Sequence, residues 1–445
     1  MLTDSAIRSI VDAVMVAAKA DEAEVTIFEG DSALTRFANN EIHQNVAEQD
    51  ASLLVRVAQG KRVGVASLNR ADPAGARLAA ERAAELARFQ VENPDYAGMP
   101  GPSPASATRG VAPGTLTFGP DQRAAGVRAV VSQAMAAGLT AAGAFSTEHS
   151  RVTLANSHGA LQQHESTHAN LNTVIMSPTS SGFGDHTAVD VTEIDAEAIG
   201  ARAVRKAVEG REPRSLEPGA YTVVLEEPAV ADLLDFLSYE GFGAQAVQEG
   251  RSFMAGHLGQ QVAGANVSIW DDGLANDTLT MPFDFEGVPR LRVDLIRDGV
   301  AVGAVYDRLT AAKEHRASTG HALPAGSTFG PIPLHLHLAA GTASYGDLVA
   351  GVKRGVLVTR FWYTRTVHPL TVTVTGMTRD GTFLIEDGRI VAAVRNLRFT
   401  QSYLEALRNV EAIGRDTKLV REFGGSNRVP ALRIAGWNFT GGTEH

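Results

Sequence analysis

The first 210 residues carry the same pattern twice, and this duplication limits the possible folds more than any other feature of the chain. Each copy begins with an expected helix, continues through alternating strand-like runs, and closes with a second helix. The quartet Arg36-Phe37-Ala38-Asn39 aligns with Thr153-Leu154-Ala155-Asn156. Short alternating strands also resemble one another by chance. The expected helices are 3–19, 72–87, 121–137 and 195–208, and the expected strands are 24–28, 34–38, 52–57, 62–67, 142–145, 151–155, 169–176 and 187–191.

Two breaks divide the chain. Residues 93–120, with Pro-Gly-Pro-Ser-Pro at 100–104, are too rich in Pro, Gly and Ser for a packed element, so we expect a surface crossing or lid between the two copies. A second break, Glu212-Pro213-Arg214-Ser215-Leu216-Glu217-Pro218-Gly219, precedes a region of different character. We therefore expect a duplicated α/β domain at 1–213 and a second domain at 214–445.

The second half consists mainly of short strand-like runs with turn signals between them. These runs are 221–225, 267–270, 291–296, 303–307, 334–338, 356–363, 370–375, 382–386 and 389–394. Helical patterns occur near 229–239 and 402–410. Such spacing is typical of a β-rich domain that forms a barrel or a sandwich. The fold class expected for the whole chain is thus α+β.

Composition excludes several classes of function. The net charge of −10 and the pI near 5.7 argue against a protein that grips the nucleic-acid backbone, which requires a basic face. No run of 18 apolar residues and no basic start before an apolar core occur, so we expect a soluble, cytoplasmic protein that does not bind membranes. The absence of cysteine excludes disulfides and thiolate chemistry.

One stretch, His164-Glu165-Ser166-Thr167-His168, matches the HExxH signature of zinc peptidases. Only on a helix would the two imidazoles meet at one metal, with Glu165 beside the bound water. The surrounding Asn, Thr and β-branched residues favour a strand, on which the histidines would lie about 13 Å apart. We therefore expect no zinc at His164, Glu165 and His168, although a helix here would make the chain an active zincin.

A second candidate is the loop Ser318-Thr319-Gly320-His321. A glycine between two hydroxyls and an imidazole suits a loop that faces substrate, and Ser318, Thr319 and His321 are the residues we expect to do so. The alternative is that the hydroxyls hold the turn by hydrogen bonds to the backbone.

Two further groups are interpreted as structural. His335 and His337 would share one face of a strand and could bind one metal ion together. No third ligand lies at a suitable spacing in the sequence, so we expect that face to meet solvent or a partner. Asp271-Asp272-Gly273 and Asp284-Phe285-Glu286-Gly287 each place two carboxylates together beside a glycine, and turn formation explains them better than acid–base chemistry does.

Three segments resemble one known family. They are residues 36–45, residues 280–323, and Leu233-Leu234-Asp235-Phe236-Leu237-Ser238-Tyr239-Glu240-Gly241. Over essentially its whole length the chain resembles the TldD/PmbA family, also called modulators of DNA gyrase, and specifically its TldE (PmbA) branch. In that family the TldD-type subunit carries a helical HExxxH motif. Here Asp235, Phe236 and Glu240 stand at the motif positions, so both histidines and the general base are missing.

The resemblance, together with the missing histidines and general base, implies a function. Phenylalanine cannot accept a proton, and an oxygen-only pair is a poor zinc site. We expect a non-catalytic subunit of a TldD/TldE-type zinc metallopeptidase that degrades or processes unfolded peptides. We expect no cofactor in this chain and zinc in the TldD-like catalytic partner. The alternative is a stand-alone, homodimeric peptide-binding or scaffold protein.

Overall fold

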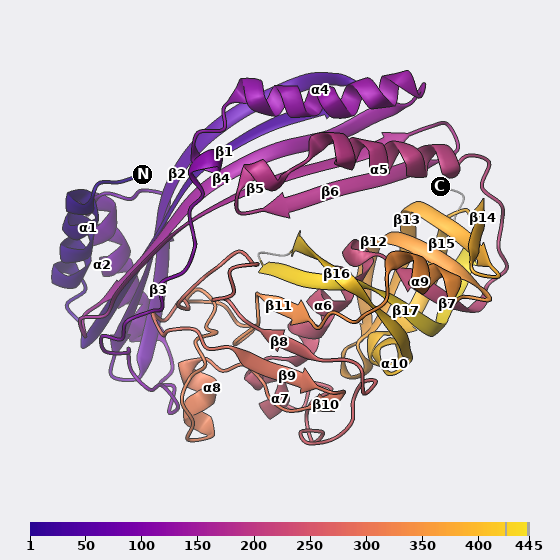
Figure 1. Ribbon diagram of the computed structural model, residues 1–445. Coiled ribbons are helices and arrows are strands. Elements are labelled where there is room, and N and C mark those ends of the chain that lie inside the picture. The colour runs from indigo at the N-terminus through magenta and orange to yellow at the C-terminus, as the bar shows by residue number, and fades with distance from the viewer. Residues whose placement is uncertain (423–424, 443–445) are drawn as a thin grey trace.

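The computed structural model describes residues 1–422 and 425–442, and its first half is built on one long curved sheet (Figure 1). The strand order is β3-β2-β1-β4-β5-β6, and every neighbouring pair is antiparallel. The two copies, β1–β3 and β4–β6, meet where β1 pairs with β4 at the centre of the sheet. The strands are β1 Glu22–Ala38, β2 Glu41–Gln59, β3 Arg62–Leu68, β4 Thr140–Asn156, β5 Leu161–Met176 and β6 Ser181–Ala188.

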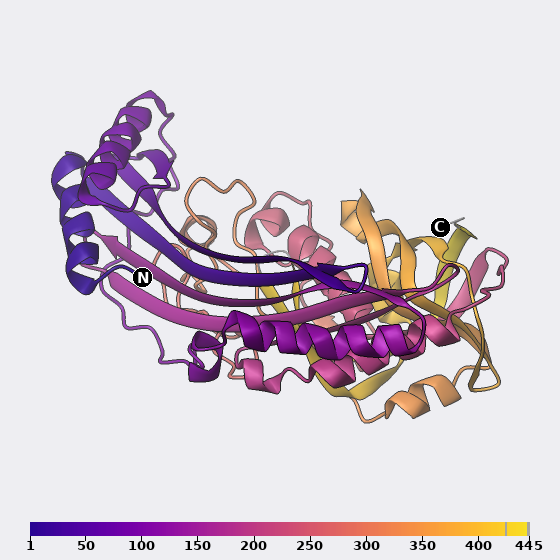
Figure 2. The ribbon, with the colours of Figure 1, turned by 90° about the horizontal axis from the view of Figure 1, so that it is seen from above.

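The helices gather at opposite ends of this sheet, with α1 and α2 at one end and α4 and α5 at the other (Figure 2). Each pair covers its own core, so the duplication is also a duplication of cores. Asp72 starts α2 as an N-cap that accepts from the Gly75 amide, and buried alanines let this helix lie close to the strands. The helices are α1 Asp4–Ala17, α2 Pro73–Phe89, α3 Pro113–Leu116, α4 Pro120–Ala136 and α5 Ala196–Glu209.

The strands of this sheet are longer than we expected. Runs 24–28 and 34–38 were predicted as separate strands, but both belong to the single 17-residue strand β1. Glu29, Gly30 and Asp31 between them look like turn residues. They nevertheless pair with β2 on one side and β4 on the other, so the sheet keeps them extended.

The second half contains a closed barrel. Strands β7, β12, β13, β15 and β17 follow one another in the sheet, and β17 also pairs with β7, which closes the ring. Strands β8–β11 extend the sheet from β17. The α+β class with a barrel-like second half is thus confirmed. The strands are β7 Gly219–Leu225, β8 Ile269–Asp271, β9 Val293–Arg297, β10 Val300–Ala301, β11 Leu336–Leu338, β12 Arg354–His368, β13 Thr373–Glu386, β14 Arg389–Ala393, β15 Leu397–Ser402, β16 Val410–Glu422 and β17 Gly425–Gly442.

Helices in this half are short except for α6, which packs against β17 and β12. The helices are α6 Glu227–Gly241, α7 Ala244–Gln248, α8 Arg308–Lys313, α9 Tyr345–Ala350 and α10 Tyr403–Arg408, with 3₁₀ turns at Val191–Glu193 and Pro369–Thr371. The expected strand at 303–307 is wrong, because those residues form no strand, and β15, β16 and β17 were not predicted. No helix in the described part of the chain is long and apolar enough to cross a membrane.

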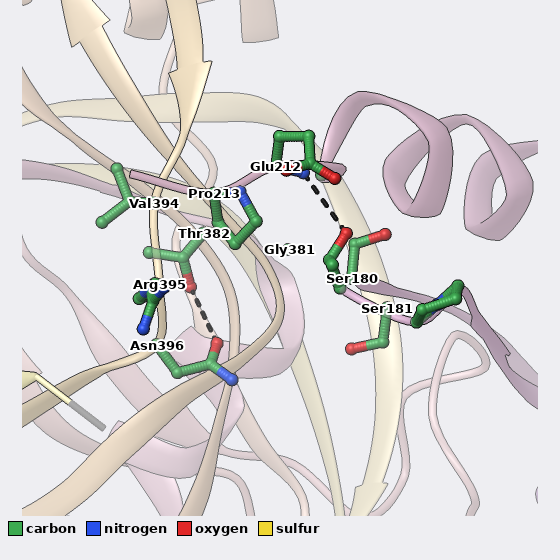
Figure 3. A pocket seen from close by; sticks show the side chains of 12 residues that line it. Ser180, Ser181, Glu212, Pro213, Gly381, Thr382, Val394, Arg395 and Asn396 are labelled. Carbon is green, nitrogen blue, oxygen red and sulfur yellow. Dashed lines mark hydrogen bonds between the residues drawn. The ribbon is translucent and has the colours of Figure 1, made fainter. Parts of the chain in front are cut away.

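Buried charges join the two halves of the chain, and a polar cleft lies beside them. Lys206 of α5 forms an ion pair with Glu226, just ahead of α6, and donates to Thr359 of β12 at 2.6 Å. Tyr345 of α9 donates to the same Glu226 at 2.8 Å. A cleft of about 500 Å³ lies near this network. Figure 3 shows its lining, where Ser180 and Ser181 face Thr382 and Asn396 of the barrel.

Candidate functional site

Helix α6 provides one wall of the candidate site. Its first turn contains Pro228, which suits a helix start because proline has no amide hydrogen to leave unpaired. Leu233, Leu234 and Leu237 are fully buried and anchor the helix in the barrel core. The remaining side of the helix borders an open pocket.

This pocket has a volume of about 600 Å³ and is mainly apolar. Helix α6 contributes Asp235, Phe236, Ser238 and Tyr239, the loop before β11 contributes Phe329 and Ile332, and β12 and β17 contribute Thr364, Arg365, Thr366 and Asn427. The rings of Tyr239 and Phe329 lie 5.2 Å apart at centroid, and both side chains are about half exposed. The pocket therefore presents aromatic surface at its rim and a few polar groups within.

The residues at the HExxxH positions do not form a zinc site. Asn427 donates to Asp235 at 2.6 Å, and Thr366 donates to Glu240 at 2.7 Å, so different strands hold the two carboxylates. Phe236 packs edge-on against Tyr403 with 5.8 Å between ring centroids. A zinc ion needs about four ligands and a base near its water, and neither requirement is met. Nowhere in residues 1–422 and 425–442 are three or more His, Asp or Glu side chains arranged so that they could hold a metal ion.

Asp232 lies one turn before Asp235 and was missed by the sequence reasoning. Tyr403 and Thr364 donate to its two oxygens at 2.6 and 2.9 Å. Burial raises the pKa of Asp232 to about 6, and these two hydrogen bonds oppose the rise. No motif marks the residue, because its partners come from β12 and from α10.

His164, Glu165 and His168 lie on strand β5, as expected. His164 donates from Nε2 to the Thr280 carbonyl at 2.9 Å, and Arg421 donates to His168 at 2.5 Å. Glu165 interacts instead with Arg151, at 3.4 Å. Burial, reinforced by Arg421, lowers the pKa of His168 to about 3. Both histidines contact the second domain, and their strand geometry does not fit a shared zinc ion.

The Ser318–His321 loop is tied to the backbone around it. Ser318 and Thr319 both donate to the Tyr306 carbonyl, at 3.0 and 3.1 Å. His321 is fully buried, and its Nε2 lies 2.9 Å from Asp271. These contacts correspond to the backbone-holding alternative. A substrate-facing role for Ser318, Thr319 and His321 stays a prediction.

Of the residues interpreted as structural, Asp284 is confirmed, because it accepts from the Glu286 and Val288 amides within its own turn. In the other group the turn is held by Asp272, which accepts from the Leu274 amide, while Asp271 is fully buried at the end of β8. The expectation of a solvent-facing or partner-facing side was wrong for His335 and His337, which are 6% and 4% exposed. Trp270 stacks on His337, with ring centroids 5.3 Å apart, and this packing removes the imidazole from solvent.

Comparison with known proteins gives consistent matches. Three domain models of the PmbA/TldA metallopeptidase family match the chain. Domain 1 matches residues 23–87, the central domain matches residues 120–211, and the C-terminal domain matches residues 218–441. Metalloprotease PmbA of Escherichia coli O157:H7 is 23% identical over 442 residues, which are 95% of this chain and 94% of that protein.

Other relatives match over a shorter region or by fold. A metalloprotease of Methanothermobacter thermautotrophicus is 27% identical over 237 residues, 51% of this chain and 49% of that protein, so the match spans about half of that relative. The crystal structure of TldE from Thermococcus kodakarensis has a TM-score of 0.90 at 20% identity and covers 97% of this chain and 100% of that one. That likeness shows a shared fold.

Proposed function

The chain belongs to the PmbA/TldD metallopeptidase family, and from this premise we propose that it is the non-catalytic, TldE-like subunit of a zinc metallopeptidase that processes unfolded peptides. The observation that carries the proposal is the state of the HExxxH positions. Phe236 stands where the base would stand, and Asp235 and Glu240 are held apart by Asn427 and Thr366. In this proposal the zinc and the base belong to a TldD-like partner.

The α6 pocket supports a role in presenting peptide. Strand β12 pairs with β7 only from Gly355 to Val358, while its pairing with β13 continues to His368. Beyond Val358, the edge away from β13 pairs with no other strand in the described part of the chain. Thr364 and Thr366 on this stretch line the pocket. An extended peptide could add to such an edge with little sequence preference, and the aromatic rim would take its apolar side chains.

The decisive experiment is reconstitution. We expect the chain purified alone to contain almost no zinc and to leave an unfolded protein such as reduced casein uncut. Adding the HExxxH-bearing protein of the same host should produce hydrolysis that a chelator abolishes. In this mixture Asp235→Ala should leave the zinc content unchanged, because Asp235 is not a ligand.

Three results would contradict the proposal. The first is chelator-sensitive hydrolysis by the chain alone. The second is near-stoichiometric zinc that is lost on His164→Ala, with Glu165→Gln as the companion test of a base. The third is a self-associated chain that binds peptide and neither co-purifies with nor activates an HExxxH protein, which would favour the homodimeric scaffold.

A further inference from the structure

Arg290 is a fully buried arginine whose side-chain N–H donors are not matched by acceptors among the described residues around it. It lies in the segment between β8 and β9, and its backbone amide donates to the Pro282 carbonyl at 3.0 Å. None of its three side-chain nitrogens has a hydrogen-bond partner within the described residues. A guanidinium carries five N–H donors, and leaving them unmet in the interior costs several kcal/mol.

The two nearby carboxylates are committed to other groups. Asp271 is 3.9 Å from Arg290 Nη1, too far for a hydrogen bond, and its oxygens lie 2.9 Å from His321 Nε2 and 2.7 Å from the His335 amide. Asp284 accepts from three backbone amides. The guanidinium donors therefore need an acceptor from outside this set.

A cavity of about 180 Å³ adjoins Arg290 at the boundary between the two domains. Its wall mixes polar and apolar groups and comes from strands β4 and β5 on one side and from the second domain on the other. The polar lining residues include Ser150, Ser166, Thr280, His335, Arg421 and Ser426. Arg421 also lines it and lies 3.8 Å from Glu148, so these two charges offset each other. Asp271, 3.9 Å from Arg290 Nη1, offsets the charge of Arg290 without accepting a hydrogen bond from it, so the guanidinium donors beside the cavity stay unmatched in the described part of the chain.

His335, in the wall of the same cavity, is a second residue with a buried polar atom that has no partner among the residues described. That atom is the ring nitrogen Nδ1. Burial, reinforced by Arg290, lowers the pKa of His335 to about 3, so its ring is neutral and one nitrogen can donate. Gly273 leaves room for both side chains, because a Cβ there would lie 2.8 Å from Arg290 Cδ and 3.3 Å from His335 Nδ1.

We propose that this inter-domain cavity binds a small oxyanion, a carboxylate or a phosphate group, through the guanidinium of Arg290. A planar fork of donors matches the paired oxygens of such a group. The volume equals about six water molecules, enough for the anion and a few attached atoms. The cavity adjoins the α6 pocket, since Leu334 and Gly425 line both, but the proposal does not depend on the peptidase role, because the chain can be tested alone.

Binding is tested by calorimetric titration of the full chain at constant ionic strength, with chloride replaced by the probe. The probes are inorganic phosphate, N-acetylalanine and N-acetylalaninamide, and the last two differ in the carboxylate. We expect saturable, one-to-one binding of at least one anion and none of the amide. Phosphate alone would identify a phosphate-type ligand, and N-acetylalanine alone a carboxylate such as a peptide end. Failure of both anions would overturn the proposal.

Variants separate the cavity from general charge effects. Arg290→Lys keeps the charge but loses the fork, and we expect about tenfold weaker binding, while Arg290→Met should abolish it. Arg421→Gln removes a charge at the cavity wall. Its control is Arg415→Gln on the same strand, because Arg415 is exposed and forms its ion pair with Asp416. Equal losses from these two variants would indicate non-specific attraction and overturn the proposal.

A location test covers the case in which the Arg290 variants do not fold. Crystals of the unaltered protein soaked in selenate should show an anomalous peak within hydrogen-bond distance of the Arg290 guanidinium. Ordered water alone at that position, both in crystals soaked in selenate and in crystals soaked in N-acetylalanine, would mean that Arg290 is satisfied by solvent, and the proposal would be wrong.

Discussion

At the residue scale, the raised pKa of Asp232 predicts how the stability of the protein depends on pH. Its pKa is raised from 3.8 to about 6, so between these values the folded protein holds a proton that the unfolded chain has lost. The contribution of Asp232 to the free energy of unfolding therefore falls as pH rises from about 4 to 6, by roughly 3 kcal/mol in total. Asp232→Asn should gain stability relative to the unaltered protein over this range, measured by urea unfolding at pH 4 to 8.

The control for this prediction is Tyr403→Phe. The Tyr403 hydroxyl donates to Asp232 and favours its ionised form, so its removal should move the pH dependence to higher pH. A stability difference between Asp232→Asn and the unaltered protein that is flat from pH 4 to 8 would show that Asp232 is already ionised in the fold.

Single residues also show where sequence reasoning about the site stops. Asp235, Phe236 and Glu240 were found because their segment resembles the HExxxH helix of a known family, and the strand at His164–His168 was expected from its neighbours. The partners of these residues were not found. Asn427 is 192 positions from Asp235, and Arg290 is an ordinary loop arginine until the fold buries it. Long-range pairing leaves no local pattern, so only the structure reveals it.

At the scale of elements, two glycines occupy matching places in the duplicated units. A Cβ on Gly64 of β3 would lie 2.1 Å from the Ala83 carbonyl oxygen of α2, and one on Gly182 of β6 would lie 2.1 Å from that of Ala203 in α5. In each copy the third strand must touch the closing helix without a side chain between them. This correspondence supports a true duplication more firmly than the aligned quartets do.

We expect Gly64→Ala and Gly182→Ala to destabilise the protein by about 1–3 kcal/mol each, because the new methyl group would overlap backbone that is fixed in a helix. Gly30→Ala in β1 is the matched control, since a Cβ there meets nothing within 4 Å. Chemical denaturation measures all three variants. A loss for Gly30→Ala as large as the other two would mean that general strand effects, not helix contact, explain the result.

The same scale explains which elements were predicted. The four long helices of the first domain were found because their apolar period and caps are local, whereas the four-residue α3 lies in 93–120, where no packed element was expected. Strand lengths were not, since Glu29 to Asp31 resemble a turn and are kept extended by neighbours on both sides. Strands β15 to β17 were missed, although β17 closes the barrel by pairing with both β15 and β7.

At the scale of the whole molecule, the Lys206–Glu226 pair is one of the buried ion pairs that join the two domains. Both side chains are at most 10% exposed, and Tyr345 and Thr359 complete the network from two further elements. Removing one member leaves a buried charge without its partner, which costs about 3–5 kcal/mol. We expect this loss for Lys206→Met and for Glu226→Gln, measured by urea unfolding.

The double variant distinguishes pairing from simple loss of packing. Once both charges are gone no buried charge remains, so Lys206→Met with Glu226→Gln should cost clearly less than the sum of the single changes. Glu411→Gln, which breaks the partly exposed pair with Arg433, should cost less than the buried pair does, about 1 kcal/mol. Strict additivity would mean that the two groups act separately. Non-additivity with easier proteolysis at 210–219 in both single variants would show that one ion pair holds the α5 end of the long sheet against the barrel.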